Sequence, residues 1–136
     1  MREVLSYRVS VLNSLLTKRL ASIASSTPLT TNQWKVLSVL FFWPDITAAS
    51  ICDVVVLDKA AISRAIASLV RLKLAQRRHD AENNNTVIGI TPAGRKLYGE
   101  IHANICEMQA EVLGKLSRLK KDQFFEALDR IERSLR

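Results

Sequence analysis

The segment from Asp58 to Arg78, DKAAISRAIASLVRLKLAQRR, constrains the fold of this chain more than any other. Asp58 is a typical helix N-cap residue, and apolar residues follow it at the spacing of an amphipathic helix before the pattern changes to that of a short strand. From Lys59 to Arg78 every charged residue is a cation. A basic helix with small residues on its first turn favours insertion into the major groove of DNA.

Composition narrows the fold class and the partners. A chain of 136 residues that is 48% hydrophobic can bury a core, and its 4 Gly and 3 Pro favour long helices over a sandwich or barrel. The net charge of +7 indicates an anionic partner, with nucleic acid ahead of an anionic membrane surface. Two cysteines are too few for a disulfide framework. With no signal peptide or membrane span in the pattern, we expect a cytoplasmic protein without a membrane partner.

Repeated helix-start signals divide the first half of the chain. Residues 3–25 carry one apolar stripe at helical spacing. Thr30 begins a capping box, and Thr47 predicts the N-cap of a short helix over residues 48–55. Only a few residues join that short helix to the one capped by Asp58, which is the geometry of a helix-turn-helix.

A strand pair is predicted after the basic helix. Residues 74–79 and 86–90 have strand character, and the polar residues 80–85 form the turn between them. A hairpin in this position is a wing. Thr91 followed by Pro then starts a further helix, and residues 95–136 continue with helical apolar spacing.

The predicted fold is mainly α with a small β-wing: a winged helix-turn-helix domain plus terminal dimerisation helices. The boundaries are an N-terminal dimerisation helix in residues 1–28, the DNA-binding domain in residues 29–94 and C-terminal dimerisation helices in residues 95–136. The terminal helices carry more apolar surface than one winged helix could cover, which favours burial in a homodimer. The alternative is that both arms fold over their own winged helix.

Three motifs make the chain resemble the MarR family of transcriptional regulators. Leu29 to Leu40, LTTNQWKVLSVL, is similar to the second helix of the family, and Asp58 to Arg64 to the opening of its recognition helix. Ile90 to Gly94 is similar to the family's (Leu/Ile)-Thr-x-x-Gly after the wing. The resemblance implies a homodimeric repressor on a palindromic operator. It also implies release by a small aromatic or lipophilic effector, bound in a crevice between the dimerisation helices and the DNA-binding lobe.

The wing departs from the family pattern. The family usually carries Asp-x-Arg there, and its arginine enters the minor groove; Glu82 and Asn84 stand at these positions, give or take one residue. Asn side chains at 83–85 could still hydrogen-bond base edges. Val56 and Lys73 stand where the family often has glycine.

The predicted DNA contacts lie on the basic helix, on the wing and at one helix start. They are Lys59, Ala60, Ala61, Ser63, Arg64, Arg71, Arg77, Arg78, Asn83, Asn84, Asn85 and Thr47. Ser63 and Arg64 are the leading readers of base edges, and the other arginines are assigned to phosphate. The alternatives are a solvated basic helix face and, for Thr47, helix capping alone.

Other polar and aromatic residues suggest weaker sites. Trp34 is a candidate effector contact, although both it and Trp43 are more typical of core aromatics. Cys52 is expected as a buried structural thiol. His102 and Cys106 share a helix face, but without a second pair of ligands we expect neither a metal nor a cofactor.

No catalytic motif is present in the sequence. It has no Gly-rich phosphate loop, no nucleophile elbow and no metal-binding motif, so we do not expect an enzyme. A second function class stays open beside the specific regulator. The missing wing arginine is also compatible with a winged helix used for protein–protein assembly or for non-specific DNA binding.

Overall fold

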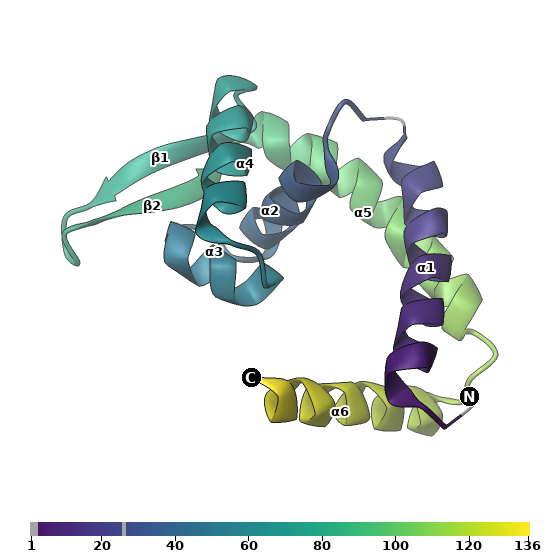
Figure 1. Ribbon diagram of the computed structural model, residues 1–136. Coiled ribbons are helices and arrows are strands. Elements are labelled where there is room, and N and C mark those ends of the chain that lie inside the picture. Colours follow the sequence, from purple (N-terminus) through teal and green to yellow (C-terminus); the bar gives the residue numbers. More distant parts are fainter. Residues whose placement is uncertain (1–2, 26) are drawn as a thin grey trace. The chain divides into compact units, whose positions relative to one another are not determined.

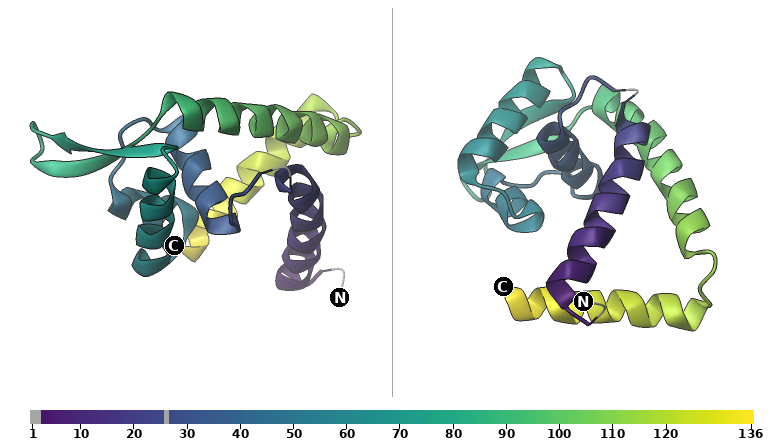
Figure 2. Two further views of the ribbon diagram at one scale, coloured as in Figure 1. Left: turned by 90° about the horizontal axis from the view of Figure 1, so that it is seen from above. Right: turned by 45° about the vertical axis from the view of Figure 1, so that its right-hand side comes forward.

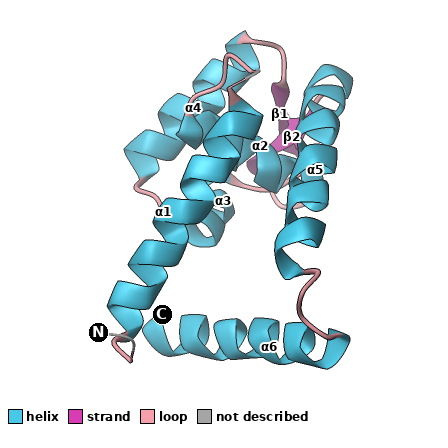
Figure 3. Cartoon of the chain, turned by 90° about the vertical axis from the view of Figure 1, so that its right-hand side faces the viewer, coloured by secondary structure: helices cyan, strands magenta, loops and turns pink. Residues whose placement is uncertain are grey.

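The chain has the element order of a winged-helix protein, which confirms the predicted fold class. The computed structural model describes residues 3–25 and 27–136, so residues 1–2 and 26 of the predicted 1–28 segment lie outside the described residues. Its elements (Figures 1 and 3) are α1 (Leu5–Ala24), α2 (Thr31–Phe42), α3 (Ala48–Val55), α4 (Lys59–Arg71), β1 (Ala75–Asp80), β2 (Asn85–Ile90), α5 (Pro92–Leu113) and α6 (Arg118–Leu135). They form two compact units, Met1–His102 and Ala103–Arg136, with α5 running from the first into the second.

Side-chain caps fix the starts of the three helices of the helix-turn-helix region. The backbone N–H of Gln33 donates to Thr30 Oγ1 at 3.3 Å, and the N–H of Thr30 donates to Gln33 Oε1 at 3.0 Å. Thr47 Oγ1 accepts from the N–H of Ser50 at 3.2 Å, and Asp58 Oδ1 accepts a backbone N–H of α4 at 2.8 Å. The predicted capping box and the two predicted N-caps are confirmed, because each side chain bonds an N–H that the helix itself leaves without an acceptor.

A single apolar core lies inside the first unit. Helix α2 packs against α3, α4 and β2, and α4 packs against α3 and β1. The largest fully buried side chains are Val36, Leu37, Leu40, Ile51, Ile62, Ile66 and Leu69. Because α4 buries one stripe in this core, its opposite stripe is turned to solvent. The helix itself lies beside the base of the wing (Figure 1).

The wing is an antiparallel hairpin that projects from this core (Figure 2). Ala75 pairs with Ile90 at its base, and the strands fall within one residue of the predicted ranges. An unpredicted bridge adds to it: the N–H of Ile46 donates to the carbonyl of Ile88 at 3.1 Å, and the reverse bond measures 2.8 Å. The loop before α3 therefore pairs with β2 along the edge that β1 leaves open.

A tight joint connects the wing to α5. Thr91 Oγ1 donates to the carbonyl oxygen of Lys73 at 2.7 Å and accepts from the N–H of Gly94 at 3.0 Å. The N–H of Thr91 donates to the carbonyl oxygen of Leu74 at 3.1 Å. A Cβ at Gly94 would overlap that same oxygen, so no side chain fits there. This close approach is the physical reason for the Thr-x-x-Gly pattern at this point of the chain.

Backbone strain marks the two positions where glycine was expected. Val56 has φ 52° and Lys73 has φ 59°, both in the left-handed region. Valine is β-branched, so this conformation is costly for Val56, whose residue is 77% exposed and gains little from packing.

The expectations that Trp43 and Cys52 are buried have different outcomes. Trp43 is 51% exposed at the C-terminal end of α2, so its predicted place in the core is wrong. It stands after the last buried turn of α2, which explains its exposure. Cys52 is half-buried and packs against the core from α3.

The terminal helices each leave apolar side chains in solvent. On α1 the exposed set includes Leu5, Val9, Leu12 and Leu15, and on α6 it includes Leu119, Phe124, Phe125 and Leu135. Helix α6 has no buried residue at all. Among the described residues, no helix combines the length and apolar character that a membrane crossing requires.

Candidate nucleic-acid interface

Helix α4 presents a basic face opposite its buried stripe. We define the basic face of α4 as its exposed residues Lys59, Ala60, Ser63, Arg64 and Arg71. The helix has no acid in its first turn. A cation at the N-terminal end opposes the helix dipole, so helix stability does not account for Lys59 there.

Ala61 does not belong to this face, and its predicted exposure is wrong. The residue is only 7% exposed, and Ala65 and Leu69 are buried along the same line of the helix. Positions separated by four and eight residues fall on one helical stripe, so the sequence already placed Ala61 with the core. The other predicted residues of the leading turn remain on the surface.

A polar groove runs beside Arg64, between α4 and the start of α2. Its cavity volume is about 160 Å³, and it is lined by Thr30, Asn32, Gln33, Ala61, Arg64, Ala65 and Ser68. Asn32 and Ser68 were missed by the sequence reasoning. No recognisable sequence motif singles out either residue. They lie next to Arg64 because α2 packs against α4.

The two arginines of the wing point to opposite faces. Arg77 stands opposite Ile88 and Arg78 opposite Val87 in the register of β1 and β2, and neighbouring strand residues alternate between faces. Arg77 therefore shares the face of Ala75, whose side chain is buried against the core. Arg78 lies on the other face, where it forms an ion pair with Asp45.

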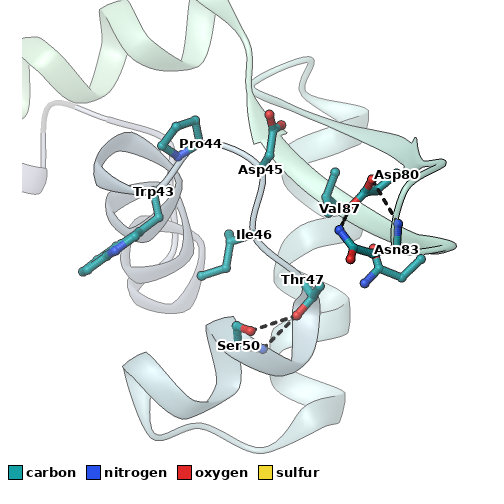
Figure 4. A pocket seen from close by; sticks show the side chains of 10 residues that line it. Trp43, Pro44, Asp45, Ile46, Thr47, Ser50, Asp80, Asn83 and Val87 are labelled. Carbon is teal, nitrogen blue, oxygen red and sulfur yellow. Dashed lines mark hydrogen bonds between the residues drawn. The ribbon is translucent and has the colours of Figure 1, made fainter.

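Asp45 controls the surroundings of Arg78. The hydrogen bond to Asp45 and the charge of that carboxylate raise the pKa of Arg78 above its ordinary value. Asp45 has φ 61° in the loop between α2 and α3, and Figure 4 shows it lining one pocket with Val87 and Asp80. Oδ1 of Asp45 lies 3.1 Å from where a Cβ of Gly89 would stand, so glycine leaves room for the carboxylate.

The wing tip is organised by its own acid. Asp80 accepts hydrogen bonds from the N–H of Glu82 at 3.1 Å and from Asn83 Nδ2 at 2.7 Å. The bond from Asn83 is the main reason that the pKa of Asp80 lies below its ordinary value. Asn84 takes the left-handed conformation with φ 50°, which Asn tolerates well. Of the three predicted asparagine contacts, Asn83 thus holds the turn with its side chain, while Asn85 begins β2.

Thr47 lines the same pocket as Asp45, between the wing and the start of α3 (Figure 4). This pocket has a volume of about 300 Å³. The Thr47 hydroxyl accepts from the N–H of Ser50 and shares a 3.0 Å hydrogen bond with Ser50 Oγ. Capping therefore occupies this hydroxyl, and a phosphate contact by Thr47 stays a prediction.

Trp34 belongs to an aromatic cluster between α2 and α5. Its ring centroid lies 5.8 Å from that of Tyr98, which lies 4.8 Å from Phe41 and stacks on His102 at 5.9 Å. The Trp34 indole N–H is buried and has no hydrogen-bond partner among the described residues. A buried donor without an acceptor is costly, so this N–H would gain from a hydrogen-bond acceptor.

His102 and Cys106 do not extend into a metal site in the described part of the chain. The thiol of Cys106 is exposed, whereas His102 is half-buried in the aromatic cluster. Within residues 3–25 and 27–136, no three His, Cys, Asp or Glu side chains are grouped so that they could hold a metal ion.

The chain is similar to known winged-helix proteins. Residues 29–94 match the family described as winged helix DNA-binding domain. A search of curated protein sequences gave no significant match. Among solved structures, a MarR/EmrR family transcriptional regulator from Acinetobacter sp. ADP1 is 25% identical, with 96% of this chain and 93% of that chain covered and a TM-score of 0.83.

Other structures extend this similarity in fold. A MarR family transcriptional regulator from Silicibacter pomeroyi is 23% identical over 99% of this chain and 91% of its own, with a TM-score of 0.89. S. aureus MepR, solved in complex with DNA, is 22% identical over 98% of this chain and 97% of its own, with a TM-score of 0.85. The structures from Acinetobacter and Silicibacter pomeroyi are described as transcriptional regulators.

Proposed function

Since residues 29–94 match the winged helix DNA-binding family and the chain has the fold of MarR family regulators, we propose that it is a homodimeric transcriptional regulator that binds a palindromic operator in double-stranded DNA. The basic face of α4 is the observation that carries the proposal. It combines cations and small residues without an acid, and a buried core holds it rigidly. The likeness in fold to MepR, which was solved with DNA, supports the same partner.

The proposed reading uses the major groove. A helix of about 10–12 Å diameter fits a groove of about 12 Å width. Arg64 would donate two hydrogen bonds to a guanine, Ser63 one to a neighbouring base, and the small side chain of Ala60 would allow close approach. Arg71 and Arg77 would contact phosphate and so position the helix.

Two copies of the chain would match the two halves of a palindromic operator. The apolar side chains exposed on α1 and α6 favour burial against a second chain, since a soluble monomer rarely exposes so many. A two-fold dimer places its recognition helices in successive major grooves, about 34 Å apart. Sedimentation as a monomer at micromolar concentration would contradict this part of the proposal.

Release from the operator would follow from an effector that prefers a DNA-incompetent dimer. We propose a small aromatic or lipophilic compound and a repressor role, with Trp34 as the candidate contact through its unpartnered indole N–H. Coupling of this kind is reciprocal, so operator DNA must weaken effector binding by the same factor. Compounds that saturate the protein without changing operator affinity would exclude themselves as effectors.

Binding selection followed by anisotropy tests the DNA-binding proposal. A duplex selected from a random library and its scrambled version are titrated with the wild type, Arg64→Ala and Lys96→Ala. Arg64→Ala should cost about 1–3 kcal/mol on the selected site and much less on the scrambled one. Lys96 is an exposed cation in the same unit but on α5. Its removal should therefore weaken binding to both duplexes slightly and equally.

The same titration separates the alternative function. A winged helix for protein–protein assembly or non-specific DNA binding is favoured by Glu82 at the wing tip, where an acid would repel phosphate. A selected-to-scrambled affinity ratio near one would support that alternative, because electrostatic binding alone does not distinguish sequences.

A further inference from the structure

We propose that Asp45 withholds Arg78 from DNA, so that Arg77 is the arginine through which the wing contacts phosphate. The inference rests on the proposed DNA-binding function and adds a positioning residue from outside the wing. Its starting point is the ion pair between Asp45 in the α2–α3 loop and Arg78 in β1.

The fold fixes Asp45 on one face of the wing. Two backbone hydrogen bonds between Ile46 and Ile88 pair the loop with β2, so the residue before Ile46 cannot drift from the strand. The carboxylate then reaches across β2 at Gly89, which has no side chain to block it, and meets the guanidinium of Arg78. Three features therefore aim Asp45 at Arg78: the bridge, the left-handed backbone at Asp45 and the glycine.

Strand alternation separates the neighbouring arginine from this contact. Arg77 points to the face that carries Ala75 and Ile88, which is the face on which β1 packs against α4. Arg78 points to the face that carries Asp45 and Val87. Two adjacent arginines thus have different electrostatic surroundings although the sequence gives them the same charge.

Phosphate would have to compete with Asp45 for Arg78. The two side chains are 53% and 43% exposed. An ion pair between such exposed groups is weak, and it favours the paired over the unpaired state by at most about fivefold. A phosphate contact by Arg78 in the wild type would gain one ion pair and lose another. The net contribution of Arg78 to DNA affinity is then small, whereas removal of the Asp45 charge would release it.

The salt dependence of DNA binding counts the cations that neutralise phosphate. Each added phosphate contact steepens the plot of log affinity against log salt by about 0.9. The variants are Arg78→Ala, Asp45→Asn, the double variant Asp45→Asn/Arg78→Ala and, as a control for lost negative charge, Glu82→Gln. Asn is isosteric with Asp and tolerates the positive φ at position 45, so the backbone is preserved.

We expect Arg78→Ala to leave the slope unchanged and Asp45→Asn to steepen it by about 0.9, with tighter binding to random duplex DNA. The double variant should return to the wild-type slope. Glu82→Gln should raise affinity and leave the slope at its wild-type value. Circular dichroism and thermal melting check that each variant folds as the wild type does.

Two results would overturn the inference. One is a shallower slope for Arg78→Ala in the wild-type background, which would mean that Arg78 contacts phosphate despite Asp45. The other is an effect of Asp45→Asn that persists in the double variant, which would make Asp45 a general charge or a structural residue. Failure of the proposed function would look different: the selected and scrambled duplexes would bind equally, while the slopes on random DNA would still decide the role of Asp45.

Discussion

Helix α4 and the wing both carry arginines, yet these cations have different surroundings in the structure. On α4 the cations lie on an exposed face without an acid, held by a buried stripe beneath. In the wing, Arg78 is paired with Asp45 and the turn is built on the carboxylate of Asp80. The difference teaches that a count of arginines does not describe the charge that a surface presents, because a loop from elsewhere in the chain can place a carboxylate beside one of them.

Geometry explains why the helix escapes this neutralisation and the wing does not. A helix groups residues three and four apart on one face, so its exposed cations stay together. A strand sends neighbours to opposite faces, and one face of this hairpin lies beside the loop that carries Asp45. We therefore expect α4 and the wing to contribute unequally to the free energy of DNA binding.

The largest effect on operator affinity should come from a double substitution in α4, compared with a double substitution in the wing. Lys59→Ala/Arg64→Ala should cost about 2–4 kcal/mol of operator binding, because a base contact is lost together with a neighbouring cation. Arg77→Ala/Asn85→Ala in the wing should cost about 1 kcal/mol, as expected for phosphate contact without base reading. Anisotropy titration at one fixed salt concentration compares them. Equal losses would remove the distinction between helix and wing.

The joint that holds both regions should be sensitive to a single methyl group. Gly94→Ala should lower the free energy of unfolding by about 2–3 kcal/mol, because the new Cβ must displace the carbonyl of Leu74. Gly99→Ala is the matched control. Its Cβ would meet only Phe41, at 4.0 Å, so better helix propensity should stabilise the protein by about 1 kcal/mol. Urea denaturation measures both, and a neutral Gly94→Ala would show that the joint can yield.

A left-handed residue beside α4 and another in the wing allow a further comparison of the two regions. Val56→Gly in the turn before α4 should stabilise the protein by about 1 kcal/mol, since a β-branched side chain is strained at φ 52°. Asn84→Gly at the wing tip should change the free energy of unfolding by only about 0.3 kcal/mol, because Asn tolerates φ 50°. Thermal melting should move upward by about 4 °C for Val56→Gly alone. An equal gain from Asn84→Gly would mean that the tip is as strained as the turn.

The smallest effect concerns the order of the wing tip at low pH. The ionised form of Asp80 accepts the hydrogen bonds of the turn, and this lowers its folded pKa. The contribution to the turn is therefore complete above the ordinary carboxyl pKa of about 3.9 and is lost as pH falls through the lowered value. NMR titration of the Glu82 and Asn83 amides should give a midpoint below the ordinary value. In Asn83→Ala that midpoint should rise, and an unchanged midpoint would assign the shift to another cause.

Local signals were sufficient to predict most of the fold. Thr30, Thr47 and Asp58 each cap the helix that the sequence assigned to them, because a cap depends on residues only three positions away. The Thr91-to-Gly94 motif likewise appears where expected. The buried position of Ala61 could have been predicted from its spacing to Leu69, and its assignment to the exposed face was an error of helical phase.

Contacts between distant segments could not be predicted in the same way. Nothing near Asp45 in the sequence points to Arg78, and the pairing depends on the unpredicted bridge between Ile46 and Ile88. Asn32 reaches the side of Arg64 only through the packing of α2 on α4. Charge and local pattern in the sequence therefore indicated neither the Asp45–Arg78 ion pair nor the position of Asn32 beside Arg64.

The Thr91-to-Gly94 joint makes α5 a stiff lever on the base of the wing. Two hydrogen bonds of Thr91 and the close approach of Gly94 leave no slack against the chain that leaves α4 at Lys73 and Leu74. A rotation of the first turn of α5 would therefore move the chain that follows α4 and the base of the wing with it.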